Sequence, residues 1–404
     1  MNTFTKINLN NWRQFDSIDL DLRNQVTVLT GQNGCGKTTI LNILNRHFGW
    51  DMNLVSTPFI NKKTRKKIFS DIFKLFESPE SKNSNNVIPI GYIEYSNGVK
   101  SNLQTKEIVD ARYNLTFQNL QNVIGLHIPS HRPNATYQQV AQIPTNPKTI
   151  QQQYQEYQSF LFASYNSNNV RNPGLILKQS LISLALFGYG NQAVVPSQEY
   201  LKVFEEFQEI LRKIMPESIG FEKIEIRMPD VVLITRSGDF SLDAMSGGIN
   251  ALLGMAWQIH MYGADKEQCT VTIDEPENHL HPSMQRTLLP SLAKAFPKYK
   301  FIIATHSPFI VSSMPEANVY GLIYNENNRV ESLKIEEADL SGTPNKILRE
   351  ILDVPSNLPV WVEERVRKLL ESLDEKTPEE RANHLFALLE ELGISDQISE
   401  FNFH

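Results

Sequence analysis

The 404-residue sequence contains little cysteine, no long hydrophobic run and no excess of basic residues. Its two cysteines, Cys35 and Cys269, lie far apart, which argues against a disulfide scaffold or a cysteine-based zinc site. No stretch approaches the ~18 consecutive apolar residues of a transmembrane helix. The first twenty residues mix polar and apolar positions and lack the pattern of a signal peptide. We therefore expect a cytoplasmic protein with no membrane partner.

The charge is distributed unevenly along the chain. Residues 331–404 contain 8 basic and 17 acidic residues, whereas residues 1–330 contain 31 basic and 28 acidic residues. The near-neutral first part argues against a protein that coats DNA with a polybasic surface. The acidic part carries two amphipathic patterns, and the second opens with a capping box at Thr377-Pro-Glu-Glu380. These patterns predict a helical hairpin with acidic outer faces.

A glycine-rich loop between a strand pattern and a helix pattern is the strongest chemical signal. Gly31-Gln-Asn-Gly-Cys-Gly-Lys-Thr38 fits G-x4-G-K-[ST] and follows the β-branched run Val26–Thr30. Such a loop points backbone N–H groups and a positive helix end at phosphates. Lys37 would reach the β- and γ-phosphates of ATP, and the Thr38 hydroxyl would hold Mg²⁺. The residues that we expect to bind the nucleotide here are Asn33, Gly34, Gly36, Lys37, Thr38 and Thr39.

A second apolar strand pattern, Thr270-Val-Thr-Ile-Asp-Glu275, ends in two adjacent carboxylates. In a phosphoryl-transfer site Asp274 would bind Mg²⁺, and Glu275 would polarise the attacking water. An acidic strand end at a surface turn is the alternative interpretation. That alternative does not explain why the carboxylates follow a phosphate-binding loop in the expected order.

Two weaker signals accompany these motifs. Ser246-Gly-Gly248 precedes a helical pattern, so it offers a hydroxyl and backbone N–H groups at a helix N-terminus. The same three residues also fit a simple turn. The apolar strand pattern that starts at Phe301 ends in His306. Taken alone, such a histidine is more often structural than ligand-binding.

In this order and spacing, the four signals resemble those of the ABC-type ATPases, in the branch that includes RecF, SMC-like proteins and the OLD family. The segment Asp274–Pro282 resembles the run that follows the catalytic glutamate in OLD proteins. Asn11–Phe15 resembles the opening of RecF and SMC-like chains, which would place Arg13 near the nucleotide. The resemblance implies an α/β ABC-type P-loop ATPase head with a mixed β-sheet, a helical insertion and a C-terminal helical hairpin.

The resemblance also implies a composite site. Two chains would pair head to tail, and each would lend Ser246, Gly247 and Gly248 to the ATP of the other. Lys37 and Ser246 would clamp the γ-phosphate and His306 would sense it, so that Glu275 and His306 form the catalytic set. The expected organisation is an ATPase lobe at 1–130, a helical insertion at 131–220, a second lobe at 221–335 and a helical docking or oligomerisation module at 336–404.

The tail extends the resemblance toward bacterial anti-phage defence. Asn345–Leu352 and the helical pattern after it are similar to the region that follows the ATPase in PtuA-type and OLD-type defence ATPases. We find no Toprim nuclease pattern, so we expect a homodimer or higher oligomer that regulates a separate effector, a nuclease or toxin. The alternative is a RecF-like DNA-repair ATPase whose ATP state gates DNA binding. A transporter ATPase fits less well.

Four further features have either two interpretations or no assigned role. The basic run Lys62–Lys67 is typical of a solvated charged helix, and it also fits a contact with nucleic acid or a partner. His279 and His281 fit the turn after the carboxylates better than a metal site with Glu277. The Cys35 thiol either fills a loop position or is sensitive to oxidation. Ser130-His-Arg132 lies where a segment joining the two lobes is expected.

Overall fold

The computed structural model describes residues 2–50, 54–60, 65, 67–72, 86–107, 109–132, 137–143, 148–166, 172–342, 344–350, 352, 359–372 and 377–392. The chain divides into two units, Met1–Ser341 and Gly342–His404. The sequence-based division into four domains remains a prediction. None of the described helices has the length and apolar character that a membrane span requires.

The first unit is built around a mixed sheet of eleven strands. Five adjacent strands are mutually parallel, and the other six extend the sheet mainly through antiparallel pairs. This arrangement confirms the predicted α/β fold with a mixed sheet. In spatial order the strands are β10 (Thr116–Gln118), β8 (Lys100–Lys106), β7 (Val87–Tyr95), β1 (Phe4–Trp12), β2 (Phe15–Asp21), β18 (Val330–Ile335), β17 (Asn318–Tyr324), β3 (Val26–Gly31), β16 (Lys300–Ala304), β15 (Thr270–Asp274) and β11 (Gly125–Ile128).

Residue patterning follows the two halves of the sheet. Every residue of β3, β15 and β11 is buried, as expected for parallel strands that are covered on both faces. In the antiparallel half, β2 alternates, burying Phe15, Ile18 and Leu20 while the residues between them are more exposed. One half-covered face gives this two-residue period. The parallel half is therefore the enclosed part of the sheet, and it contains the chemical motifs.

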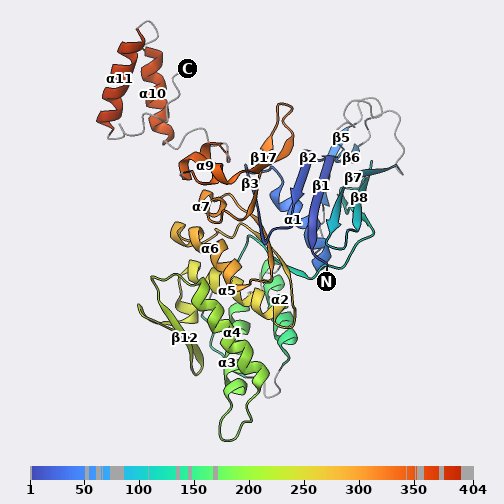
Figure 1. The fold of residues 1–404 in the computed structure, drawn as a ribbon, viewed down its shortest axis with the longest axis vertical. Coiled ribbons are helices and arrows are strands. Elements are labelled where there is room, and N and C mark those ends of the chain that lie inside the picture. The colour runs from blue at the N-terminus through green and yellow to red at the C-terminus, as the bar shows by residue number, and fades with distance from the viewer. Residues whose placement is uncertain are drawn as a thin grey trace. The chain divides into compact units, whose positions relative to one another are not determined.

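Helices surround the parallel strands. Helix α1 contacts β3, β11, β15 and β16, and α5 contacts β11. Figure 1 shows α2 to α5 and β12 grouped together, away from β1, β2, β7 and β8. The helices of this unit are α1 (Lys37–Asn45), α2 (Ile150–Asn166), α3 (Pro173–Tyr189), α4 (Gln198–Ile214), α5 (Gly247–Gly263), α6 (Pro282–Ala295), α7 (Pro308–Val311) and α8 (Glu337–Leu340), with 3-10 helices η1 (Arg46–Phe48) and η3 (Leu242–Ala244).

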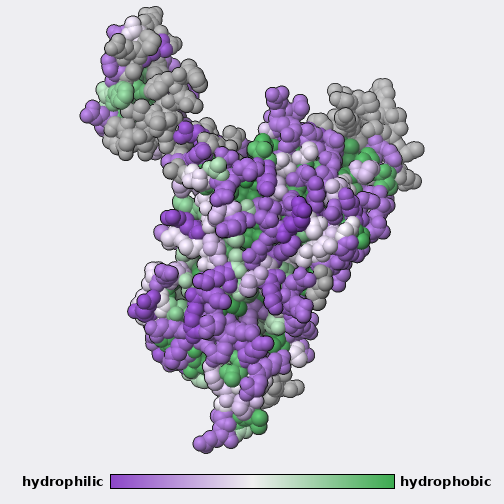
Figure 2. Space-filling model, in the orientation of Figure 1, coloured by the Kyte–Doolittle hydropathy of each residue, from purple (hydrophilic) through white to green (hydrophobic). Residues whose placement is uncertain are grey.

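The described residues of this unit also form three smaller sheets. Strands β12 (Phe221–Arg227), β13 (Asp230–Thr235) and β14 (Gly238–Ser241) form an antiparallel sheet that packs on α3 and α4. The two-stranded sheets pair β4 (Leu54–Val55) with β9 (Arg112–Tyr113) and β5 (Thr57–Ile60) with β6 (Lys67–Ser70). The visible face of the described first-unit residues is mostly hydrophilic, with hydrophobic residues in small separate groups (Figure 2).

The second unit contains α9 (Pro344–Glu350), α10 (Val360–Ser372) and α11 (Pro378–Glu391). Helices α10 and α11 contact each other through a small core formed by Val362, Val366, Leu385 and Leu389. Both bonds of the capping box between Thr377 and Glu380 are present at the start of α11. The predicted helical hairpin and its capping box are therefore confirmed.

Candidate active site

Four chemical motifs meet at one edge of the sheet because they follow parallel neighbouring strands. The glycine-rich loop follows β3, the two carboxylates end β15, His306 follows β16, and the segment toward Arg132 follows β11. Ligands of open α/β sheets bind at the carboxyl ends of such strands. The fold therefore brings together residues that are far apart in the sequence.

Backbone geometry in the loop requires glycine at two positions. Gly31 has a φ of +136°, and a Cβ there would lie 2.4 Å from the Leu322 carbonyl oxygen. Gly36 has a φ of +102°, and a Cβ there would lie 2.4 Å from Cζ of Phe15. Side chains rarely adopt such conformations and have no space here. Gly36 is also the N-cap of α1, and no side chain caps that end, so its N–H groups are available to an anion.

Lys37 is buried and turns back on its own loop. Its Nζ donates to the carbonyl oxygens of Gly31 at 2.9 Å and Gln32 at 3.0 Å, and it lies 3.5 Å from Nδ1 of His306. Burial lowers the pKa of the ammonium, and the nearby Cys35, Asp274 and Glu275 oppose this shift. Hydrogen bonds from an ammonium to charged phosphate oxygens are stronger than those to neutral carbonyls. The Lys37 ammonium would therefore favour phosphate oxygens over its present carbonyl partners.

Thr38 and Asp274 form a direct pair across the site. The Thr38 hydroxyl donates to Oδ2 of Asp274 at 2.9 Å and lies 3.2 Å from Oδ1. Asp274 is 5% exposed, and burial raises the pKa of its carboxyl, although the Thr38 hydrogen bond acts in the opposite direction. A hydroxyl and a carboxylate at this distance are the hard oxygen ligands that Mg²⁺ prefers.

Glu275 has a left-handed backbone, with a φ of +45°. Its N–H donates to the Ala304 carbonyl at 2.8 Å, which anchors it to the end of β16. Its carboxylate lies 4.0 Å from Nε2 of His306 and accepts a hydrogen bond from Asn278 at 3.1 Å. The carboxylate therefore lies between the end of β15 and the histidine.

His306 is placed by its backbone as well as by its ring. Its N–H donates to Oε1 of Glu277 at 2.7 Å, which ties the turn after β15 to the loop after β16. Burial lowers the pKa of the imidazole, and the positive charge of Lys37 lowers it further, so the neutral ring is favoured at pH 7. A neutral ring can donate one N–H hydrogen bond to a phosphate oxygen.

The Ser246–Gly248 motif begins α5. The Ser246 hydroxyl is the N-cap and accepts from the Ile249 N–H at 3.5 Å. A Cβ on Gly248 would lie 2.8 Å from the His279 carbonyl oxygen, so this helix end packs closely on the turn after β15. Among the described residues, no hydrogen bond joins Ser246 to the glycine-rich loop of the same chain.

The Arg13 side chain contacts residues outside the glycine-rich loop. Its side chain donates to the Val55 carbonyl at 3.0 Å and lies 3.6 Å from the Asp71 carboxylate. The neighbouring Gln14, which the sequence analysis missed, contacts the Gly34 carbonyl at 3.4 Å. The expected nucleotide contact of Arg13 therefore remains a prediction.

Asn33 and Gly34 are exposed and Thr39 is half-buried at the start of α1.

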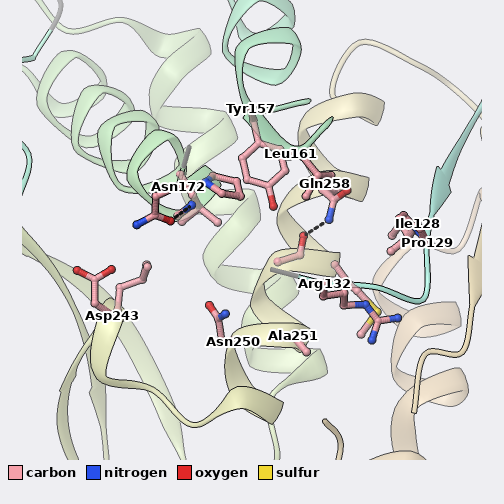
Figure 3. A pocket seen from close by; sticks show the side chains of 16 residues that line it. Ile128, Pro129, Arg132, Tyr157, Leu161, Asn172, Asp243, Asn250, Ala251 and Gln258 are labelled. Atoms are coloured by element: carbon pink, nitrogen blue, oxygen red, sulfur yellow. Dashed lines mark hydrogen bonds between the residues drawn. The ribbon is translucent and has the colours of Figure 1, made fainter. Parts of the chain in front are cut away.

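Arg132 is a second residue whose role the sequence left open. Its guanidinium donates to the backbone carbonyls of residues 274, 275, 276 and 278, over distances of 3.2 to 3.5 Å. Arg132 also borders a cavity between the segment after β11 and helix α5 (Figure 3). Other residues that line this cavity are Pro129, Asn172, Asp243, Asn250 and Gln258.

The structure also places Cys35, His281 and part of the basic run. Cys35 is fully buried, and burial raises the pKa of its thiol, which disfavours the reactive thiolate. His281 is the N-cap of α6 and accepts from the Ser283 N–H. Among the described residues no three His, Cys, Asp or Glu side chains are grouped as metal ligands. Most of the basic run Lys62–Lys67 lies outside the described residues.

The residues present fit a nucleoside triphosphate with a divalent cation. The uncapped start of α1 and the Lys37 ammonium supply donors and positive charge for phosphates. Thr38 and Asp274 supply oxygen ligands, and Glu275 supplies a carboxylate beside them. A phosphate site, a cation site and a base within one strand edge are the groups that phosphoryl transfer to water requires.

Comparison with known proteins supports this assignment at the level of the family. The Retron Ec83 probable ATPase of Escherichia coli is 29% identical over 133 residues, which are 31% of this chain and 23% of that protein. The Septu protein PtuA of Bacillus thuringiensis is 24% identical over 180 residues, which are 41% of this chain and 46% of that protein. The chain thus spans less than half the length of these relatives.

A solved structure is also similar. The Smc head domain with an extended coiled coil from Pyrococcus furiosus, bound to the C-terminal domain of ScpA, is 13% identical, and the similarity covers 87% of this chain and 100% of that chain with a TM-score of 0.43. The family described as AAA ATPase domain matches residues 4–180 and 56–311. Because this match extends over more than half of the sequence, the chain belongs to the AAA ATPase domain family.

Proposed function

We propose that the protein is an Mg²⁺-dependent ATPase in which ATP joins two copies head to tail and controls a separate effector in bacterial anti-phage defence. The observation that carries the ATPase proposal is the cluster at one strand edge. Within it, Thr38 lies 2.9 Å from Asp274, and Lys37 lies 3.5 Å from His306. These residues come from three separate parts of the chain: Lys37 and Thr38 begin α1 after β3, Asp274 ends β15, and His306 follows β16.

The proposed roles follow from charge and position. Lys37 leaves its carbonyl partners to hold the β- and γ-phosphates, and the N–H groups of Asn33, Gly34, Gly36, Lys37 and Thr39 surround the phosphate chain. Thr38 and Asp274 hold Mg²⁺, which when bound would neutralise charge on the phosphate oxygens. Arg13 completes the set if its guanidinium turns from Asp71 to the nucleotide.

Glu275 orients the attacking water and accepts its proton, and the neutral His306 ring contacts the γ-phosphate. In the head-to-tail dimer, the Ser246 hydroxyl and the N–H groups of Gly247 and Gly248 meet the γ-phosphate of the other copy. The start of α5 supports this role because a helix N-terminus attracts anions. ATP then holds the two copies together, and hydrolysis separates them.

The test of the ATPase proposal is Glu275→Gln. We expect the substitution to keep nucleotide binding and to lower kcat by at least ~10², because it removes the base without changing size. It should also accumulate an ATP-bound dimer, measured by light scattering. Wild-type turnover in this variant would reject the assignment of Glu275, and wild-type protein without ATPase activity would reject the function.

The defence role is supported by the similarity to the Septu protein PtuA and the retron ATPase. We propose that the α10–α11 hairpin, whose outer residues include the exposed Trp361 and Phe386, docks the effector or further copies of the chain. Co-purification with the products of neighbouring genes tests this, because the effector should bind stoichiometrically and change activity on ATP turnover. Tight, salt-sensitive and ATP-dependent binding of duplex DNA by the chain alone would instead support a repair ATPase.

A further inference from the structure

The turn that carries Glu275 has an unusual backbone. Glu275 and His279 have φ values of +45° and +72°, in the left-handed region that non-glycine residues rarely adopt. Such conformations persist where surrounding contacts determine them, and they concentrate at functional sites. The contacts that hold this turn are therefore of functional interest.

Arg132 supplies most of these contacts from outside the turn. Its Nη1 donates to the carbonyls of Pro276 at 3.4 Å and Asn278 at 3.3 Å. Its Nη2 donates to the carbonyls of Asp274 at 3.5 Å and Glu275 at 3.2 Å. Only the planar, multi-donor guanidinium can serve four acceptors from one side chain; an ammonium is a compact point charge.

Asn278 connects the turn to the same segment and to the carboxylate. Its Nδ2 donates to Oε2 of Glu275 at 3.1 Å and to the Ser130 carbonyl at 3.2 Å. Through Asn278, the Glu275 carboxylate is linked to Ser130, and the Glu275 carbonyl is bound directly by Arg132. The segment after β11 therefore holds both the carboxylate and the backbone of Glu275.

We propose that Arg132 and Asn278 are positioning residues that hold Glu275 in its left-handed conformation and aim its carboxylate at the attacking water. This inference rests on the proposed ATPase function. Neither side chain contacts the glycine-rich loop among the hydrogen bonds of the described residues, so their effect reaches the reaction through Glu275.

The position of Arg132 adds a link to the helical part of the chain. Arg132 and Pro129 line one side of the cavity whose other sides are formed by residues of α2, α5 and the start of α3 (Figure 3). The segment after β11 therefore lies between the Glu275 turn, which Arg132 contacts, and the cavity that these helices line.

The experiment compares full-length wild type with Arg132→Ala, Arg132→Lys and Asn278→Ala in steady-state ATP hydrolysis and in nucleotide binding. We expect Arg132→Ala to lower kcat by about 10²-fold while KM changes by less than about threefold, because misplacement of a reacting group affects turnover more than binding. Arg132→Lys should restore little, and guanidinium ion added to Arg132→Ala should restore part of kcat. Arg227→Ala, at an exposed arginine on β12, is the matched control and should leave kcat unchanged.

A double variant separates positioning from a general structural effect. If Arg132 acts through Glu275, Arg132→Ala should lower kcat by less than about twofold in the Glu275→Gln background, because the effects of residues that act as a unit are not additive. If the wild type hydrolyses ATP and Arg132→Ala has the same kcat, the positioning role is wrong but the ATPase function stands. A full additional loss of kcat in the double variant leads to the same conclusion. Absence of hydrolysis in the wild type overturns the proposed function and this inference with it. Thermal unfolding of each variant shows whether a loss of kcat reflects loss of the folded protein.

Discussion

The hydroxyl of Thr38 donates to both carboxylate oxygens of Asp274, at 2.9 and 3.2 Å, and so joins the first turn of α1 to the end of β15. The two residues are 236 positions apart in the chain. Their contact brings together the two oxygen groups that we propose as ligands of Mg²⁺. Burial of the Asp274 carboxyl raises its pKa and so disfavours the ionised form, whereas the Thr38 hydrogen bond favours that form.

The first prediction concerns Asp274→Asn. We expect Mg²⁺-dependent nucleotide binding to weaken at least about tenfold, because a charged ligand is lost. We also expect equal or higher thermal stability without Mg²⁺. The reason is that burial raises the pKa of Asp274 above its unfolded value, so the stability that this group contributes is lost as the pH rises through the folded pKa. Thermal unfolding with and without Mg²⁺ measures both effects; a variant that is less stable without the cation would contradict the second.

The second prediction tests the composite site by mixing two inactive variants. Lys37→Ala removes the phosphate-binding ammonium, and Ser246→Arg blocks the start of α5. Each alone should hydrolyse no ATP. An equal mixture should recover about a quarter of the wild-type rate, because half of the randomly formed dimers are mixed and each of these contains one intact site of two. A mixture as inactive as its components would argue against sites shared between chains.

The third prediction concerns acid stability. His127 and His260 are buried: Nδ1 of His127 shares a hydrogen bond with the Thr272 hydroxyl, and Nε2 of His260 donates to the Val203 carbonyl. Burial lowers the pKa of each imidazole to about 4. Since the unfolded value is about 6.5, their stabilising contribution is complete above pH 6.5 and is lost as the pH falls toward 4. The loss reaches roughly 3 kcal/mol for each histidine.

Urea unfolding at pH 7.5, 6 and 5 measures this loss. His260→Gln is the matched variant, because an amide can still donate to the Val203 carbonyl but takes up no proton. Its stability should depend on pH less steeply than that of the wild type. Equal slopes in the two proteins would show that His260 is not the group that binds the proton.

The fourth prediction concerns a buried ion cluster. Lys178 of α3 has a fully buried side chain, and its Nζ lies 2.8 Å from Asp230 and 2.5 Å from Asp243. Burial acts to lower the pKa of Lys178, but the hydrogen bonds to both aspartates outweigh it and raise the pKa. Lys178→Met should destabilise the protein by about 3–5 kcal/mol, because it leaves a buried carboxylate without its cation.

Adding Asp243→Asn to Lys178→Met should recover part of that loss, since it removes the stranded charge. Asp243 belongs to η3, which directly precedes the Ser246 motif. The single variant should therefore also weaken ATP-dependent pairing at temperatures where it remains folded. Chemical unfolding and light scattering measure the two effects. Additive losses in the double variant would show that the two side chains act independently.

The sequence predicted the residues of the strand edge because each motif is local. The glycine-rich loop, the carboxylates and His306 all follow apolar runs, and parallel strands bring such ends together. The paired helices of the second unit were also predictable, because amphipathic spacing and a capping box lie within a few residues of each other.

The network around Glu275 was not predictable in the same way. Arg132 contacts residues more than 140 positions away. Its acceptors are backbone carbonyls, which every residue has, so no residue type in the sequence indicates them. The engagement of Arg13 with Asp71 and Val55 was equally hidden, because it depends on pairing with distant segments. The three-stranded sheet from β12 to β14 was visible as strands, but its packing on α3 and α4 required the tertiary structure.

The chain leaves the strand edge after Arg132 and returns to it at η3 and α5. Pro129 and Arg132, before this excursion, and Asp243 and Asn250, at its end, line the same cavity. The core therefore fixes the two ends of this excursion but not the number of residues between them. Closing a flexible loop of twice the length costs only about 0.6 kcal/mol more. Insertions between these ends are thus compatible with an unchanged strand edge, so this part of the fold can acquire a new recognition surface without disturbing the proposed ATP site.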